Sequence, residues 1–188
     1  MKVKPYISHS ELNKVRNNKN ISISEVYFKH YFNIKFDRKI VYDEDIILEI
    51  EDIKIPNTYN KITYYDNDRL IWLSPYEWMY ITNSDKFHNL CKSPKYEYID
   101  DLKSIIDLSS AYTTIKLSGE YYINVLNKIT TLDILENITS EYCAQSLISN
   151  IKTIIWMDNL TKDIFLTVNS SYSQYLFETI LDASQEFI

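Results

Sequence analysis

The chain has 188 residues and a formal net charge of −6 at pH 7, with 20 Lys and Arg against 26 Asp and Glu. Because nucleic-acid binding requires clustered basic side chains, this balance argues against a nucleic-acid partner. No stretch of about 18 apolar residues is present, so we expect no membrane helix and predict a cytoplasmic protein. The ordinary hydrophobic fraction of 45% predicts a folded, globular chain. Its length predicts one domain, residues 1–188, or two subdomains of about residues 1–104 and 105–188.

The first half of the chain contains an exposed segment and a pair of strands. Residues 10–20 are dense in Asn, Lys and Arg, which contribute little to a core, so we expect an exposed or mobile segment there. Residues 40–50 form a mostly apolar run around three acidic residues. Residues 69–73 and 77–81 have the composition of two strands. Pro75 lies between them, and because proline cannot donate a backbone hydrogen bond to a sheet, it is expected at the bend.

The second half shows clearer periodicity. Residues 112–117 alternate in the manner of a strand, and Gly119 then opens a helix whose apolar residues recur every three or four positions. Ser170 or Ser171 is the expected N-cap of a closing helix. Three strands precede that helix, and the four elements are expected over residues 141–148, 151–157, 164–168 and 172–187. This order predicts an α+β fold with antiparallel sheets and helices packed on one face.

Few residues have the spacing of a cofactor or metal site. Gly119 is the only glycine, which excludes both the glycine-rich turn that binds dinucleotides and the phosphate-binding loop of nucleotide hydrolases. No metal-ligand spacing relates the histidines to one another or to the cysteines. A surface or core-edge position is therefore expected for each of the three histidines, His9, His30 and His88.

The cysteines and carboxylates are explained more simply by structure than by catalysis. Cys91 and Cys143 are expected to be reduced, packed thiols, and the strand setting of Cys143 argues against a nucleophile. The acidic residues at 43–45 and 100–101 are expected to be solvated. Asp107 is flanked by apolar residues and followed by two serines, so we expect a buried carboxylate that fixes a turn, with catalysis as the less favoured alternative.

Four segments, in the same order and at the same spacing, resemble the γ subunit family of heterotetrameric sarcosine oxidase. They are Ile55-Pro56-Asn57-Thr58, Trp72-Leu73-Ser74-Pro75-Tyr76-Glu77-Trp78, Ile106-Asp107-Leu108-Ser109 running on to Leu117-Ser118-Gly119, and Cys143-Ala144-Gln145 with the C-terminal helix. The third segment also resembles, more weakly, the folate-binding domain of aminomethyltransferases of the glycine-cleavage system. The resemblance therefore implies the fold of that domain, with ferredoxin-like βαβ elements.

The same resemblance implies a non-catalytic structural or assembly subunit of the complex that oxidatively demethylates sarcosine to glycine, transfers the one-carbon unit to tetrahydrofolate and forms hydrogen peroxide. It implies no catalytic, cofactor-binding or metal residue on this chain, because FAD, FMN, NAD and tetrahydrofolate are expected on other subunits. The implied partners are the α, β and δ subunits, with α in direct contact. Large aromatics in strands usually fill a core, but Tyr and Trp are also enriched at interfaces. The residues expected at the contact with α are Trp72, Trp78, Tyr80, Tyr172 and Tyr175.

Two alternatives remain open from the sequence. A stand-alone folate-binding or one-carbon-transfer protein would fit the fold, and tetrahydrofolate binding by the isolated chain would favour it. A scaffold subunit of a related N-methyl amine dehydrogenase, such as one acting on dimethylglycine, would fit almost as well. Only the identity of the partners separates this second alternative from sarcosine oxidase.

Overall fold

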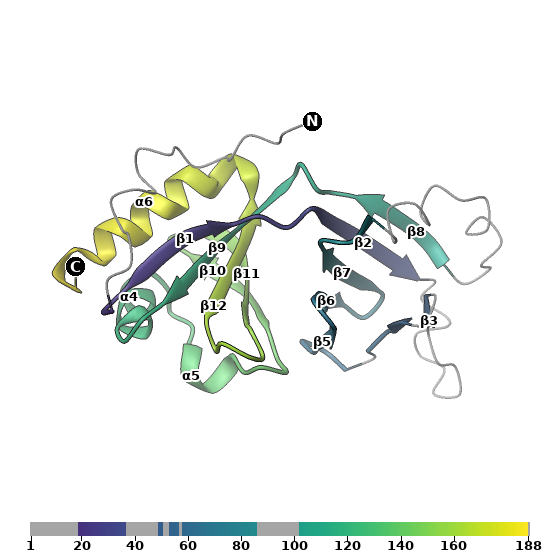
Figure 1. Cartoon of the computed structure of the whole chain (residues 1–188), viewed down its shortest axis with the longest axis horizontal. Helices are drawn as coiled ribbons and strands as arrows, with labels where there is room; N and C mark the ends of the chain where they lie inside the picture. The colour runs from purple at the N-terminus through teal and green to yellow at the C-terminus, as the bar shows by residue number, and fades with distance from the viewer. Residues whose placement is uncertain (1–18, 37–48, 51–52, 57, 86–101, 188) are drawn as a thin grey trace. The chain divides into compact units, whose positions relative to one another are not determined.

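The structure is a computed structural model that describes residues 19–36, 49–50, 53–56, 58–85 and 102–187. Its contacts divide the chain into two compact units, the first made of residues 1–27 and 110–188 and the second of residues 28–109. Each unit contains a five-stranded antiparallel sheet, and helices flank the sheet of the first unit, so the fold is α+β as predicted (Figure 1). Most of the expected segment at 10–20 and of the run at 40–50 lies outside the described residues.

The sheet of the first unit has the strand order β1-β9-β12-β11-β10. Strand β1 pairs along its whole length with β9, with Ser22 opposite Ser118. A segment from before residue 28 therefore completes the sheet of the first unit, whose other strands all follow residue 110. The strands expected at 112–117, 151–157 and 164–168 are confirmed, and the one expected from residue 141 begins at Ala144. The bounds are β1 (Ser22–Val26), β9 (Tyr112–Ser118), β10 (Ala144–Ile148), β11 (Ile151–Met157) and β12 (Ile164–Asn169).

Two helices, α4 (Tyr122–Ile129) and α6 (Ser173–Ala183), lie on the same face of this sheet (Figure 1). Their apolar stripes and alternate strand residues form one buried cluster, which includes Leu126 of α4, Phe177 of α6 and Leu166 of β12. The helix expected after Gly119 is therefore confirmed. A short helix, α5 (Ile134–Asn137), follows α4, and the Asp133 side chain caps it by accepting a hydrogen bond from the backbone N–H of Glu136 at 3.1 Å.

The start of the closing helix differs from the prediction. A turn of 3₁₀ helix, η3 (Ser170–Tyr172), precedes α6, and the N-cap of α6 is Tyr172, which makes no side-chain capping bond. The expectation that Ser170 or Ser171 caps the helix is wrong, because both serines belong to the preceding turn. A second such turn, η4 (Gln185–Phe187), ends the described part of the chain.

Gly119 is required where β9 leads into α4. Its φ is +107°, a conformation that side chains disfavour, and a Cβ atom here would lie 2.6 Å from the backbone oxygen of Asn20. The same backbone oxygen accepts a hydrogen bond from the Tyr121 N–H at 2.9 Å. The single glycine therefore allows the segment before β1 to pack directly on the start of α4.

The sheet of the second unit has the order β5-β6-β7-β2-β8. The strands expected at 69–73 and 77–81 are confirmed as β6 and β7, with Pro75 in the turn between them. Phe32, Trp78 and Tyr80 belong to its buried core. The bounds are β2 (His30–Phe36), β5 (Ile62–Tyr65), β6 (Asp68–Ser74), β7 (Glu77–Thr82) and β8 (Leu102–Asp107), and β3 (Glu49–Ile50) pairs with β4 (Ile53–Lys54) in a separate two-stranded sheet.

Two of the sequence segments quoted above meet in this second unit. The indole N–H of Trp78 donates to the backbone oxygen of Pro56 at 2.9 Å, and Trp72 lies directly opposite Trp78 on the neighbouring strand. The indole thus buries its apolar surface while its polar atom is satisfied. Among the described residues, no helix is long and apolar enough to cross a membrane.

Candidate functional site

The aromatic residues expected at a partner interface divide into buried and exposed groups. Trp78 and Tyr80 are buried, with 0% and 3% exposure, and Trp72 packs against the same core. The expectation that the strand aromatics present surface to a partner is therefore corrected for Trp78 and Tyr80. Both faces of β7 are covered, so alternation along this strand does not separate inside from outside. Tyr172 and Tyr175 are more than half exposed, with 52% and 56% exposure.

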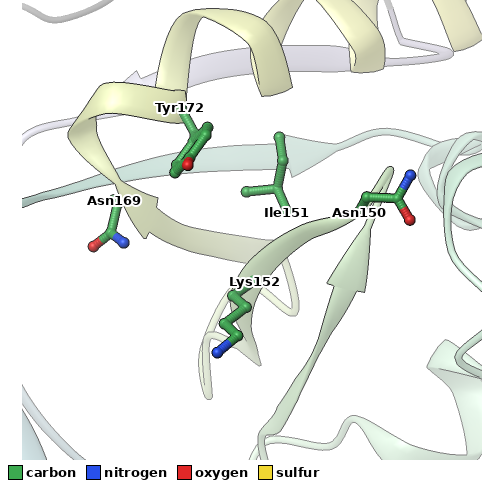
Figure 2. A pocket seen from close by; sticks show the side chains of 5 residues that line it. All are labelled: Asn150, Ile151, Lys152, Asn169 and Tyr172. Atoms are coloured by element: carbon green, nitrogen blue, oxygen red, sulfur yellow. The ribbon is translucent and has the colours of Figure 1, made fainter.

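A hollow of about 350 Å³ lies beside Tyr172 (Figure 2). Its lining comes from the β10–β11 turn, the start of β11, the end of β12 and η3. The lining residues are Asn150, Ile151, Lys152, Asn169 and Tyr172. This is the candidate site of the first unit, and we call it the Tyr172 hollow.

Local backbone geometry forms the two walls of the Tyr172 hollow. Ser149 and Asn150 both have positive φ, 47° and 69°, as a two-residue hairpin turn requires, and asparagine accepts this conformation readily. The opposite wall is fixed through Ser170. Its backbone N–H donates to the Ala111 oxygen at 2.8 Å, and its carbonyl accepts from the Ser173 hydroxyl at 2.8 Å. Tyr172, within this turn, is therefore held in place although its ring is exposed.

The polar side chains of the Tyr172 hollow are available to a ligand. Asn150, Lys152 and Asn169 are all exposed. None of the three makes a side-chain hydrogen bond or ion pair with a residue in the part of the chain that the structure describes. None of the described residues that line the hollow carries a carboxylate. The described lining therefore consists of one ammonium, two amide groups, an apolar side chain and an aromatic ring.

The second unit contains a charged cluster of a different kind. Nε2 of His30 lies 2.9 Å from Oδ1 of Asp85, and the ammonium of Lys29 contacts the other oxygen of the same carboxylate. These two hydrogen bonds lower the pKa of Asp85 to about 2. His30 is 7% exposed and its ring stacks on that of Phe32, so its core-edge position is confirmed. His9 and His88 lie outside the described residues.

This cluster ties the start of β2 to the residues that follow β7. Over residues 19–36, 49–50, 53–56, 58–85 and 102–187, no group of three or more His, Cys, Asp or Glu side chains could hold a metal ion. We therefore interpret the cluster as structural, because its contacts hold the start of β2 against the residues that follow β7.

Cys143 and Asp107 have structural roles. Cys143 is buried, with 1% exposure, and burial raises the pKa of its thiol to about 12, which disfavours the nucleophilic thiolate. Its assignment as a packed thiol is confirmed. Asp107 is exposed, so its expected burial is wrong. Its expected turn-fixing role is confirmed, since it accepts hydrogen bonds from the backbone N–H and the hydroxyl of Ser109, whose hydroxyl oxygen accepts from the Tyr31 N–H at 3.1 Å.

Cys91 and the acidic residues at 43–45 and 100–101 lie outside the described residues. Sequence reasoning also missed the Tyr172 hollow, apart from Tyr172 itself. A turn, a strand end and a 3₁₀ turn supply its lining, and no motif connects these segments along the chain.

Comparison with known proteins identifies the fold. A chain of the heterotetrameric sarcosine oxidase from Corynebacterium sp. U-96 superposes with a TM-score of 0.78 and 14% identity, covering 100% of this chain and 97% of that chain. The glycine cleavage system aminomethyltransferase T from Bartonella henselae superposes with a TM-score of 0.59 and 13% identity, covering 92% of this chain and 48% of that chain. No family model and no curated protein sequence matches the chain.

These likenesses show that the chain has the α+β fold found in a sarcosine oxidase chain and in an aminomethyltransferase. The two superpositions differ in how much of the other protein they use. The chain spans about half the length of the aminomethyltransferase, but nearly the whole of the sarcosine oxidase chain.

Proposed function

We propose that this chain is a structural subunit, of the γ type, in a sarcosine oxidase-like heterotetramer. The observation that carries the proposal is the end-to-end superposition on a single chain of such a heterotetramer, at 100% and 97% coverage. The match therefore extends over nearly all of one chain of that complex. The four sequence segments that resemble the γ family give independent support.

The proposed role is assembly. Three described side chains of a type that often takes part in catalysis have structural roles here. Cys143 is a buried thiol, Asp107 fixes a turn, and His30 is held by Asp85. In this proposal the α, β and δ subunits carry FAD, FMN, NAD and tetrahydrofolate, and α contacts this chain directly. The cytoplasm is the proposed compartment.

Co-purification tests the proposal. The chain, tagged and expressed in its native host, is expected to bring down larger, flavin-coloured subunits with sarcosine-dependent peroxide formation. Peroxide formation with dimethylglycine in place of sarcosine would assign the chain to a related N-methyl amine dehydrogenase. A colourless chain that purifies alone would contradict the assembly role.

A second candidate function is a stand-alone folate-binding protein. The superposition on an aminomethyltransferase, over 92% of this chain, favours it. Calorimetric titration of the isolated chain with tetrahydrofolate separates the two functions. Saturable binding at one site would favour the folate protein, and no heat of binding would favour the structural subunit.

A further inference from the structure

We propose that the Tyr172 hollow binds a segment of a partner protein that presents a carboxylate beside an apolar side chain. This inference rests on the proposed assembly function and adds the chemistry of the contact. The partner segment would place its carboxylate near Lys152 and its apolar side chain against the Tyr172 ring (Figure 2).

The charge of the site favours an acidic partner. The chain carries a net charge of −6, yet the described polar side chains that line the hollow are an ammonium and two amides, with no carboxylate among them. A carboxylate can accept hydrogen bonds from both Lys152 and an asparagine amide, and charge-assisted bonds of this kind are stronger than neutral ones. The hollow therefore complements a negative group, unlike the chain as a whole.

The register of the sheet widens this contact. Thr153 pairs with Val168, and Lys152 and Asn169 are the next residues along the two strands. Lys152 is in turn opposite Leu147 on the edge strand β10. Leu147 has 49% exposure, so an exposed apolar residue lies opposite the ammonium-bearing Lys152.

The aromatic part of the contact is Tyr172 with Tyr175. The two residues are three positions apart across the start of α6, a spacing that makes side chains neighbours on a helix surface. Their rings are large and exposed, and tyrosine is enriched among the residues that contribute most to interface energy. The site thus combines an aromatic anchor with a charge that defines its partner.

A fragment titration tests the hollow without any partner protein. The probes are 3-phenylpropionate, which joins a ring to a carboxylate, and the uncharged 3-phenylpropanamide, added to the full ¹⁵N-labelled chain and followed by NMR. The carboxylate is expected to shift the amide signals of Lys152, Asn169 and Tyr172 in a saturable way, and more strongly than the amide probe does. Lys152→Glu and Tyr172→Ala should each weaken binding of the carboxylate by about fivefold or more.

Matched variants control for charge and for loss of an aromatic ring. Lys19→Glu makes the same charge change at an exposed lysine, and Tyr59→Ala removes a ring that is 73% exposed in the other unit. Neither should alter the titration. Shifts that map elsewhere, or that Lys152→Glu and Tyr172→Ala leave unchanged, would overturn the assignment of the hollow, as would the absence of binding.

Co-purification with the same variants separates this inference from the proposed function. If the wild-type chain captures the flavin-containing subunits, Lys152→Glu and Tyr172→Ala should reduce the captured amount by about tenfold, and the two controls should not. Unchanged capture by both hollow variants would overturn the inference and leave the assembly function intact. A wild-type chain that captures no flavoprotein contradicts the assembly function, and the fragment titration then decides the ligand chemistry by itself.

Discussion

The side-chain amide of Asn20 donates a hydrogen bond to the backbone oxygen of Phe187 at 3.1 Å, across 167 positions of sequence. The Phe187 ring also stacks on Tyr121, with 5.0 Å between centroids, and the ammonium of Lys128 lies 4.7 Å from the centre of the Phe187 ring. Lys128 further donates to the Ala183 oxygen and pairs with Glu186. The two ends of the described chain are therefore fastened to the same helix, α4.

Loss of the Phe187 ring should destabilise this junction. We expect Phe187→Ala to lower the free energy of unfolding by about 1–2 kcal/mol, because the ring is half-buried and its stacking and cation contacts are both lost. Urea denaturation followed by circular dichroism measures the change. Tyr59→Ala, which removes a well-exposed ring, should cost less than about 0.5 kcal/mol. Equal losses in the two variants would contradict the role of the junction.

Gly119→Ala should be more damaging. The added methyl group would meet the backbone of Asn20 and Ile21 at under 3.0 Å, and the residue would remain at positive φ. We expect a loss of about 2–4 kcal/mol in the free energy of unfolding, measured by urea denaturation. Glu120→Ala, at the next and exposed position, should change it by less than about 0.5 kcal/mol. A stable Gly119→Ala variant would show that β1 does not need this close approach.

The buried hydroxyl of Tyr80 should make the folded chain less stable in alkali. Its pKa is raised above the ordinary value near 10 by burial and by the hydrogen bond that its hydroxyl donates to Asp68 at 2.5 Å. Because the folded-state pKa is the higher one, this contribution is complete below pH 10 and decreases as the pH rises above 10. Tyr80→Phe should lose about 1 kcal/mol at pH 8 and show a shallower decline above pH 10. The free energies of unfolding of the wild type and of Tyr80→Phe are measured from pH 8 to pH 11. A parallel decline of the two values would contradict this role of Tyr80.

Cys143 should be protected from thiol reagents and should also respond to alkali. In a Cys91→Ser background, we expect modification by a disulfide reagent at pH 8 to be at least about 100-fold slower in the folded chain than in urea. The pKa of about 12, raised by burial from about 9, makes the contribution of the neutral thiol complete below pH 9 and progressively lost between pH 9 and pH 12. Cys143→Ala should remove that part of the pH dependence. Rapid modification of the folded chain would show that the thiol is accessible.

The elements that could be predicted from the sequence are those whose pattern is local. Alternation at 112–117, the helical stripe after Gly119 and the bend at Pro75 each depend on neighbouring residues, and each is confirmed. The burial of Trp78 agrees with the usual core position of large strand aromatics, and only the expected interface position of Trp78 and Tyr80 is wrong. Trp78, Met79, Tyr80 and Ile81 are all buried, so period-two alternation carries no information there. Asp107 was misplaced for the opposite reason, since its apolar neighbours lie on an edge strand where Ile106 itself is 47% exposed.

Non-local features could not be predicted. The five residues of β1 contain nothing that specifies a partner some 90 positions away, yet they pair with β9 over their full length. The Tyr172 hollow likewise depends on the turn at Ser149 and on the end of β12, which meet only because β11 pairs with β12. Pairing of distant strands brings these residues together, and pairing of this kind leaves only a weak trace in a single sequence.

The pairing of β1 with β9 also constrains the order in which the two units can fold during translation. Residues 28–109 form one continuous unit and can fold as soon as they emerge, since domains generally fold as units during synthesis. Strand β1 is made before them, but its partner β9 begins only at Tyr112, and the next strand of that sheet, β12, begins at Ile164. Of the described strands, β1 is therefore translated first but is among the last to pair, after the second unit has been synthesised.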